Sequence, residues 1–259
     1  MQYLKYPFQI LIIVLGKKTR TLSEEHAVSA KRCMDFLNNC FFSILKVTGI
    51  LIFKIFFHIE AKSDGRIPLS GPLIVAANHF SFMDPVALQS IFPRRIAFMM
   101  TELYYEGRGK WLFQLLRCIC VKERGSNIAA LKAGINVLKN NGVVGIFPEG
   151  GVSREGRLQE GISGIGFLVK KSGAAVIPAF IFGTYEALPK GAKLPKPSRI
   201  KIIFGKPMLF KEGGNGSQGQ TITEITDQIM EQIEQLSFLF RMSCRDSLRK
   251  DGIRLPPEL

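Results

Sequence analysis

A predicted strand is joined to a predicted helix by Asn78-His79-Phe80-Ser81-Phe82-Met83-Asp84-Pro85. The strand is indicated by a short apolar run over residues 72–77 that follows Gly71. The helix is indicated by Asp84, a residue type favoured at the N-cap, and by Pro85 at the first helical position. We therefore expect His79 at the carboxyl end of a strand, where ligand sites of open α/β sheets lie.

The spacing of His79 and Asp84 suits an acid–base pair. A short strand-to-helix turn brings the two side chains together, and a carboxylate on one ring nitrogen fixes the tautomer and raises the basicity of the other. A simpler interpretation is open at this point. Helix capping fully explains Asp84, and a histidine in a loop is usually a surface residue.

The charge and the cysteine content of the chain limit the classes of ligand that it can bind. The formal net charge of +14 indicates an anionic partner, such as nucleic acid, a membrane surface or a phosphorylated small molecule. Nucleic acid is disfavoured, because the sequence contains no zinc-finger, RNP or helix-turn-helix pattern and its basic residues are spread along the chain. The five cysteines form no C-x-x-C pair and have no neighbouring histidine, so we expect reduced thiols and no metal.

The N-terminal region is apolar and basic. Residues 8–15 are too short to span a bilayer, and a signal peptide is disfavoured because no small-residue cleavage site follows. Residues 36–59 predict an amphipathic helix whose Lys46 and Lys54 lie about 80° apart, opposite an apolar arc. We expect this helix to lie in a membrane interface; a core helix and a membrane span with snorkelling lysines are the alternatives.

The rest of the chain alternates between strand-like and helix-like segments, which predicts an α/β fold with a mainly parallel central sheet flanked by helices. Strands are expected at 73–77, 95–99, 119–122, 143–147, 175–182 and 200–204, and helices at 85–90, 110–116, 128–140, 161–171 and 222–239. A polar segment at 61–71 marks the domain boundary. Residues 1–62 are the expected membrane-associated helical region and residues 63–259 the α/β domain.

A second motif, Gly145-Ile146-Phe147-Pro148-Glu149-Gly150-Gly151, ends another predicted strand in a glycine turn. Arg154 and Arg157 follow closely. Backbone N–H groups in such a turn, together with guanidinium groups, can hold a phosphate or a developing oxyanion.

The two motifs together resemble the glycerolipid acyltransferase family, the lysophosphatidic acid acyltransferases. The family's first block is similar to Asn78-His79-x-Ser81-x-x-Asp84 and its third to Phe147-Pro148-Glu149-Gly150. Val121-Lys122-Glu123-Arg124-Gly125 resembles the second block and Ala175-Val176-Ile177-Pro178-Ala179 the fourth. The resemblance covers residues 73–207, with the four blocks in order.

One position departs from the family pattern. The third block usually continues with Thr-Arg-Ser, whereas this chain has Gly151-Val152-Ser153. Val152 therefore stands where the family's arginine is expected, which leaves the acceptor open.

The resemblance implies a mechanism and a set of site residues. His79 would act as general base on an acceptor hydroxyl, and Asp84 would orient it. No covalent acyl-enzyme is needed, because the thioester of the acyl-CoA or acyl-carrier protein is already activated, and no cofactor or metal is implied. Substrate contacts are expected at Asn78, Ser81, Arg124, Glu149, Gly150, Gly151 and Arg154.

The implied reaction is acyl transfer to a lysophospholipid, most directly 1-acyl-glycerol-3-phosphate to give phosphatidic acid. The expected partners are this acceptor, the acyl donor and an anionic membrane surface, with the active site facing the cytoplasm. Three alternatives stay open: another lysophospholipid, glycolipid or glyceride as acceptor; a non-catalytic protein that binds anionic lipid; and a serine hydrolase using Ser81 or Ser153.

Overall fold

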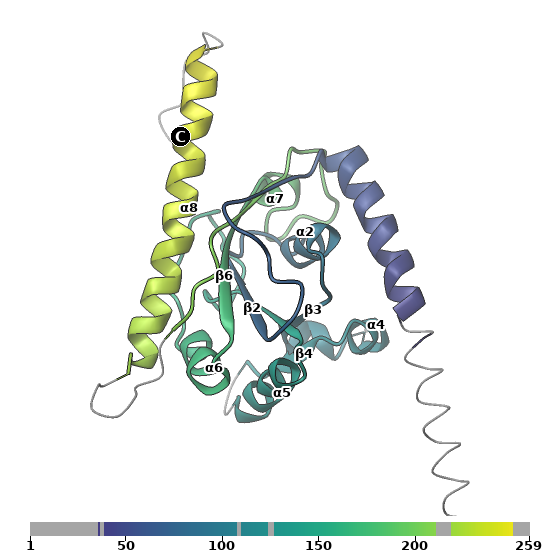
Figure 1. Ribbon diagram of the computed structural model, residues 1–259. Coiled ribbons are helices and arrows are strands. Elements are labelled where there is room, and N and C mark those ends of the chain that lie inside the picture. Colours follow the sequence, from purple (N-terminus) through teal and green to yellow (C-terminus); the bar gives the residue numbers. More distant parts are fainter. Residues whose placement is uncertain (1–35, 37–38, 108–109, 124–126, 211–218, 251–259) are drawn as a thin grey trace, which may run out of the picture. The chain divides into compact units, whose positions relative to one another are not determined.

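The computed structural model describes residues 36, 39–107, 110–123, 127–210 and 219–250 of the chain (Figure 1). The chain divides into two compact units, residues 1–46 and residues 47–259. The predictions for residues 1–35 and for Arg124 fall outside the described residues.

The larger unit is built on a seven-stranded sheet with the order β1-β7-β6-β2-β5-β3-β4. Its strands are β1 (Glu60–Ser63), β2 (Leu73–Ala77), β3 (Ile96–Thr101), β4 (Ile119–Val121), β5 (Val143–Ile146), β6 (Ala175–Phe182) and β7 (Lys201–Phe204). The five strands from β6 to β4 are mutually parallel, while β7 runs antiparallel to β6 and pairs in parallel with β1. The predicted α/β fold with a mainly parallel sheet is confirmed.

Helices connect the strands. They are α2 (Asp84–Ile91), α3 (Glu102–Tyr105), α4 (Lys110–Leu115), α5 (Ile128–Lys139), α6 (Gly164–Ser172), α7 (Thr184–Ala187) and α8 (Ile222–Lys250). The five predicted helices are present, and α8 continues eleven residues beyond its predicted end at residue 239. The single-turn helices α3 and α7 were not predicted.

Strand β1 is also absent from the predictions. Its four residues, Glu-Ala-Lys-Ser, are all exposed and show no apolar alternation. The segment is a strand only because its backbone pairs with β7 at the sheet edge, with Glu60 opposite Lys201 and Ser63 opposite Phe204. The strand spans the predicted boundary between residues 62 and 63, which stays a prediction.

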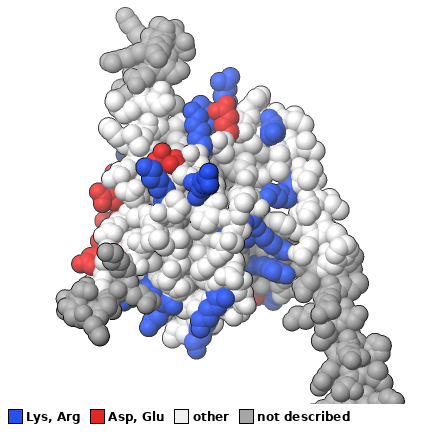
Figure 2. Space-filling model, in the orientation of Figure 1, with Lys and Arg blue, Asp and Glu red and all other residues white. Residues whose placement is uncertain are grey.

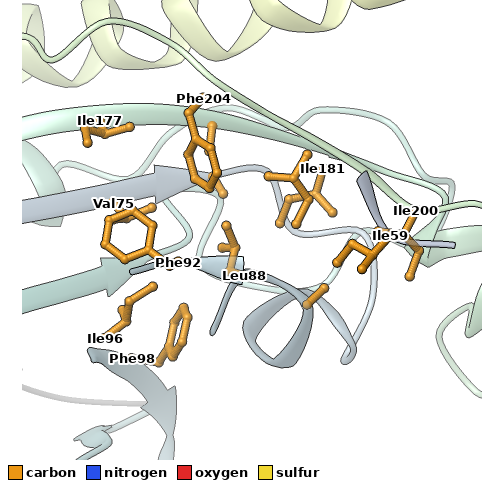
Figure 3. Close-up of a cluster of buried hydrophobic side chains, with 14 of the residues drawn as sticks. Ile59, Val75, Leu88, Phe92, Ile96, Phe98, Ile177, Ile181, Ile200 and Phe204 are labelled. Atoms are coloured by element: carbon orange, nitrogen blue, oxygen red, sulfur yellow. The ribbon is translucent and has the colours of Figure 1, made fainter. Parts of the chain in front are cut away.

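Both faces of the sheet are covered. Along β2, Leu73, Val75 and Ala77 belong to one buried cluster, while Ile74 and Ala76 belong to the other. Side chains of α2, β6 and β7 complete the first cluster (Figure 3), and those of α5, α6 and α8 complete the second. Figure 1 shows α8 on one side of β2 and β6 and α2 on the other. This double burial explains why β2 is a continuous apolar run.

The helix Asn39–Phe57 precedes the sheet and is long and apolar enough to cross a membrane, judged by length and composition. Two of its residues in the larger unit, Phe53 and Phe57, are buried in the first cluster. On the same stretch, Leu51, Ile55 and Phe56 are exposed. This last part of the helix therefore packs on the domain and still presents apolar side chains outward.

Candidate active site

The two sequence motifs meet at one edge of the sheet. β2 lies between β5 and β6, and its register places Ala76 beside both Ile146 and Pro178. Because parallel strands end at the same edge, the residues that follow β2 and β5 come together there. His79 and Glu149 are consequently neighbours in space.

His79 and Asp84 form the predicted pair. Nδ1 of His79 lies 2.9 Å from Oδ2 of Asp84, and the carboxylate is fully buried. An ionised carboxylate only accepts hydrogen bonds, so the ring carries its hydrogen on Nδ1 and its lone pair on Nε2. Among the described residues Nε2 has no hydrogen-bond partner. The imidazole can therefore accept a proton from a ligand.

The Asp84 carboxylate also shapes the turn. Its Oδ2 accepts the backbone N–H groups of Phe80 and Ser81, each at 2.8 Å. Helix α2 starts at Asp84, and Met83 occupies the N-cap position without a side-chain cap. The expectation that Asp84 is the N-cap residue is therefore wrong by one position. The Asp84 carboxylate binds backbone N–H groups of the His79 loop and not those at the start of the helix.

Glu149 ties the two motifs together. Its Oε1 accepts the backbone N–H of His79 at 2.7 Å, and its Oε2 accepts that of Gln159 at 3.0 Å. The backbone N–H of Ser153 donates to the His79 carbonyl at 2.8 Å. Burial raises the pKa of Glu149 to about 7, against the opposing effect of the two N–H donors.

The His79 ring is also fixed by stacking. It lies on Phe147, with ring centroids 4.0 Å apart and an interplanar angle of 14°. Phe147 in turn is stacked with Phe98 from β3 at 5.9 Å. No sequence signal indicated this role of Phe147, although the residue belongs to the second motif.

Asn78 and Ser81 are fully buried and bind backbone groups. The Asn78 amide donates to the Ile181 carbonyl at 2.9 Å and accepts the Ile181 N–H at 2.7 Å. Ser81 Oγ donates to the Leu188 carbonyl at 2.8 Å and accepts the N–H of Met83 at 3.1 Å. These contacts hold the His79 loop against β6 and the segment that follows it.

A serine nucleophile finds no support here. In the part of the chain that the structure describes, neither Ser81 Oγ nor Ser153 Oγ has a hydrogen bond to His79. Ser153 Oγ accepts the N–H of Arg157 instead, at 3.2 Å. A serine hydrolase needs its hydroxyl within reach of the base.

The expected free backbone N–H groups of the glycine turn do not include that of Gly150. Gly150 has φ +73°, and its N–H donates to the Phe147 carbonyl at 3.0 Å. Gly151 is exposed, and no described atom lies within 4 Å of where its Cβ would stand. Arg154 and Arg157 are exposed on the same loop. The sequence prediction that these residues contact substrate stays a prediction, as it does for Asn78, Ser81 and Glu149.

The segment after β6 forms hydrogen bonds to this loop, and no sequence signal indicated these contacts. Tyr185 OH donates to the Arg154 carbonyl at 3.0 Å, and Lys190 Nζ donates to the Val152 carbonyl at 3.3 Å. The Val152 side chain itself is buried. Within the described ranges, no group of three or more His, Cys, Asp or Glu side chains is placed to hold a metal ion.

Comparison with known proteins points to one family. Residues 58–182 match the family model described as acyltransferase. A chloroplastic 1-acyl-sn-glycerol-3-phosphate acyltransferase of Arabidopsis thaliana is 27% identical over 157 residues, which cover 59% of this chain and 44% of the plant protein. A 1-acyl-sn-glycerol-3-phosphate acyltransferase of Bacillus subtilis is 25% identical over 183 residues, which cover 69% of this chain and 87% of the relative.

A solved structure shares the fold. The crystal structure of the 1-acyl-sn-glycerophosphate (LPA) acyltransferase from Thermotoga maritima aligns with a TM-score of 0.65 and 24% identity. The alignment covers 80% of this chain and 82% of that one. The match to the Arabidopsis relative, by contrast, spans less than half of the plant protein's length.

Proposed function

Residues 58–182 match the acyltransferase family model, and on that premise we propose that the chain transfers a fatty acyl group from a thioester to the hydroxyl of a lysophospholipid. The observation that carries this proposal is the contact between His79 Nδ1 and the buried carboxylate of Asp84 at 2.9 Å. It supports a general base whose Nε2 is available to a ligand.

The proposed chemistry uses no covalent acyl-enzyme. His79 Nε2 takes the proton of the acceptor hydroxyl while its oxygen attacks the thioester carbonyl carbon. The carbon–sulfur bond then breaks, and the departing thiolate receives the proton from the imidazolium. The negative charge of Asp84 stabilises the imidazolium between these two steps.

We propose 1-acyl-glycerol-3-phosphate as the acceptor and acyl-CoA or acyl-carrier protein as the donor. The proposal is supported by the similarity to 1-acyl-sn-glycerol-3-phosphate acyltransferases of Arabidopsis and Bacillus, at 27% and 25% identity. Val152 favours a second candidate within the same reaction class, because it replaces the family's arginine. Another lysophospholipid, a glycolipid or a glyceride then becomes the acceptor.

Arg124, Arg154 and Gly151 are the proposed acceptor contacts. The exposure of Arg154 and Gly151 on the loop joined to His79 through Ser153 supports this assignment for those two residues. For Asn78, Ser81 and Glu149 we propose a positioning role, because their side chains are engaged by backbone groups. Gly150 gives the loop its turn.

We propose that the protein works on a membrane surface, with residues 1–62 as the attachment and its active site facing the cytoplasm. Drawing a sixteen-carbon chain into water would cost on the order of 12 kcal/mol, so the enzyme benefits from taking its lipids directly from the bilayer. The exposed Leu51, Ile55 and Phe56 support this attachment. Figure 2 shows Lys and Arg side chains spread over one face of the molecule, which suits anionic lipid.

The test is an acyl-transfer assay on protein purified in detergent. Palmitoyl-CoA and lysophosphatidic acid are supplied, free thiol is followed, and the lipid products are identified by mass spectrometry. We expect phosphatidic acid from the wild type and none from His79→Ala. His58→Asn is the matched control, since His58 is an exposed histidine at φ +43° and asparagine tolerates that backbone.

Each result separates the candidates. If thiol is released only with an acceptor other than lysophosphatidic acid, the proposed mechanism stands and the proposed acceptor is replaced. The absence of transfer from CoA and from carrier protein to every member of a lysolipid panel would contradict the enzymatic function. A protein that then bound anionic vesicles equally well with and without His79 would be a lipid-binding protein.

A further inference from the structure

A cation outside the sequence motifs contacts the glycine loop beside His79: Lys190, on the segment after β6. Val152 stands at the position of the family's arginine, and its side chain is only 8% exposed, so it cannot bind a charged group. Its carbonyl, however, accepts a hydrogen bond from Lys190 Nζ at 3.3 Å. We propose that Lys190 binds the anionic phosphate of the acyl acceptor in place of that arginine. This inference rests on the proposed function.

Two hydrogen bonds connect the Lys190 ammonium group with the His79 loop through the adjacent residues Val152 and Ser153. Lys190 Nζ binds the Val152 carbonyl, and the next residue, Ser153, donates its N–H to the His79 carbonyl at 2.8 Å. A phosphate held by Lys190 is therefore held next to the loop that carries the base. Such a contact would help to position a hydroxyl on the same ligand for the base.

The backbone around Lys190 is fixed in advance. The Leu188 carbonyl accepts Ser81 Oγ at 2.8 Å, which ties this segment to the His79 loop itself. On either side, the Ala192 N–H donates to Pro189 at 3.0 Å and the Lys196 N–H donates to Ala187 at 2.8 Å. A residue held this way loses less conformational entropy when it binds a ligand.

The charge of Lys190 is not neutralised within the described residues. The ion pairs found there join other residues, and none places a carboxylate within 4.0 Å of Lys190 Nζ. An ammonium group has three donors, and one carbonyl contact uses one of them. The open space beside Gly151 gives a ligand access to the same turn.

A lysine also predicts what kind of acceptor is bound. The ammonium is a compact point charge that binds phosphate oxygens without the planar two-point geometry of a guanidinium. We therefore expect an acceptor that carries a phosphate, and we expect neutral monoacylglycerol to gain nothing from Lys190.

The test compares Lys190→Gln, Lys190→Arg and the control Lys193→Gln, whose lysine is exposed on the same segment. KM is measured for lysophosphatidic acid and for palmitoyl-CoA in detergent. We expect Lys190→Gln to raise the KM of lysophosphatidic acid about tenfold or more, the loss expected for a charge-assisted hydrogen bond. The KM of palmitoyl-CoA and the rate with monoacylglycerol should change less than about twofold, and Lys190→Arg should retain most of the affinity.

A wild type that transfers acyl groups while Lys190→Gln behaves like Lys193→Gln would overturn the inference and leave the proposed function standing. Equal increases in the KM of both substrates would also overturn it, because they would indicate general damage to the site. A wild type inactive with every acceptor would remove the proposed function and this inference with it.

Discussion

The backbone N–H of His79 donates a hydrogen bond of 2.7 Å to Oε1 of Glu149, seventy residues further along the chain. The other carboxylate oxygen of Glu149 accepts the N–H of Gln159, so one buried side chain holds the loops after β2 and β5 in one arrangement. The position of the proposed base thus depends on a carboxylate that makes no contact with the imidazole ring among the described interactions.

Burial of the Glu149 carboxylate makes stability depend on pH. Burial raises the pKa of Glu149 to about 7 from 4.5, so the folded protein binds this proton more tightly than the unfolded chain. The contribution of Glu149 to the free energy of unfolding therefore falls as pH rises from about 4.5 to about 7. At about 1.36 kcal/mol per pKa unit, the loss is on the order of 3 kcal/mol.

Thermal unfolding of the wild type and Glu149→Gln between pH 5 and pH 8 measures this effect. The glutamine does not titrate, so the wild type should lose stability relative to the variant as pH rises. Parallel curves for the two proteins would show that Glu149 titrates as it does in water.

Substitution of Asp84 can separate the effect of its negative charge from that of its hydrogen bonds. Its Oδ2 receives three donors, whereas Oδ1 has no hydrogen-bond partner in the described part of the chain. Asp84→Asn can keep the three contacts through its oxygen and place its NH2 group at Oδ1. We expect a folded protein with kcat reduced on the order of 10²-fold or more, because the imidazolium loses its counter-charge.

Asp84→Ala is the companion variant. It removes the acceptor for three groups, and buried donors without partners cost about 1–3 kcal/mol each. We expect a clear fall in melting temperature that Asp84→Asn does not show. A normal kcat in Asp84→Asn would exclude Asp84 from catalysis.

Replacing Gly150 or Gly151 by alanine should have different effects on the free energy of unfolding. Gly150 has φ +73°, and a Cβ there would collide with Ile162. Gly150→Ala should therefore destabilise the protein by about 1–3 kcal/mol. A Cβ at Gly151 would have no described atom within 4 Å. Gly151→Ala should therefore change the free energy of unfolding by no more than about 0.5 kcal/mol. Equal melting temperatures for the two variants would contradict this geometry.

Asn78 acts on His79 through the backbone. Asn78→Ala leaves the N–H and the carbonyl of Ile181 without their buried partner, at a cost of about 1–3 kcal/mol for each group. We expect a lower melting temperature and a lower acyl-transfer rate. Asn140→Ala, which removes an exposed amide at the end of α5, is the control and should change the free energy of unfolding by about 0.5 kcal/mol or less. If Asn78→Ala were as stable as Asn140→Ala, the hydrogen bonds between Asn78 and Ile181 would not contribute to stability.

Membrane attachment is tested on the exposed side of the last turns of the N-terminal helix. Replacing Leu51, Ile55 and Phe56 together by serine should weaken binding to vesicles without lowering the melting temperature, because the three side chains are exposed. Flotation with phosphatidylglycerol-containing vesicles measures the binding. Unchanged flotation would place the membrane contact elsewhere in the chain.

Local sequence was sufficient for the elements whose burial is determined by their own residues. The apolar run of β2 is buried on both faces, so its composition alone indicated a buried strand. The pairing of His79 with Asp84 was also predictable, because both residues lie on one short turn. Strand β1 was not predictable, since its polar residues become a strand only through pairing with the distant β7.

The sequence by itself determined the α/β class, the His79–Asp84 pair and the resemblance to the acyltransferase family, because each depends on short stretches of residues and their spacing. Tertiary structure alone decided which side chains hold that pair in place. Ser81 meets Leu188 across 107 positions and Asn78 meets Ile181 across 103, while Lys190 reaches Val152 across 38. Such contacts involve backbone carbonyls, which every residue carries, so only the folded chain determines which of them are used.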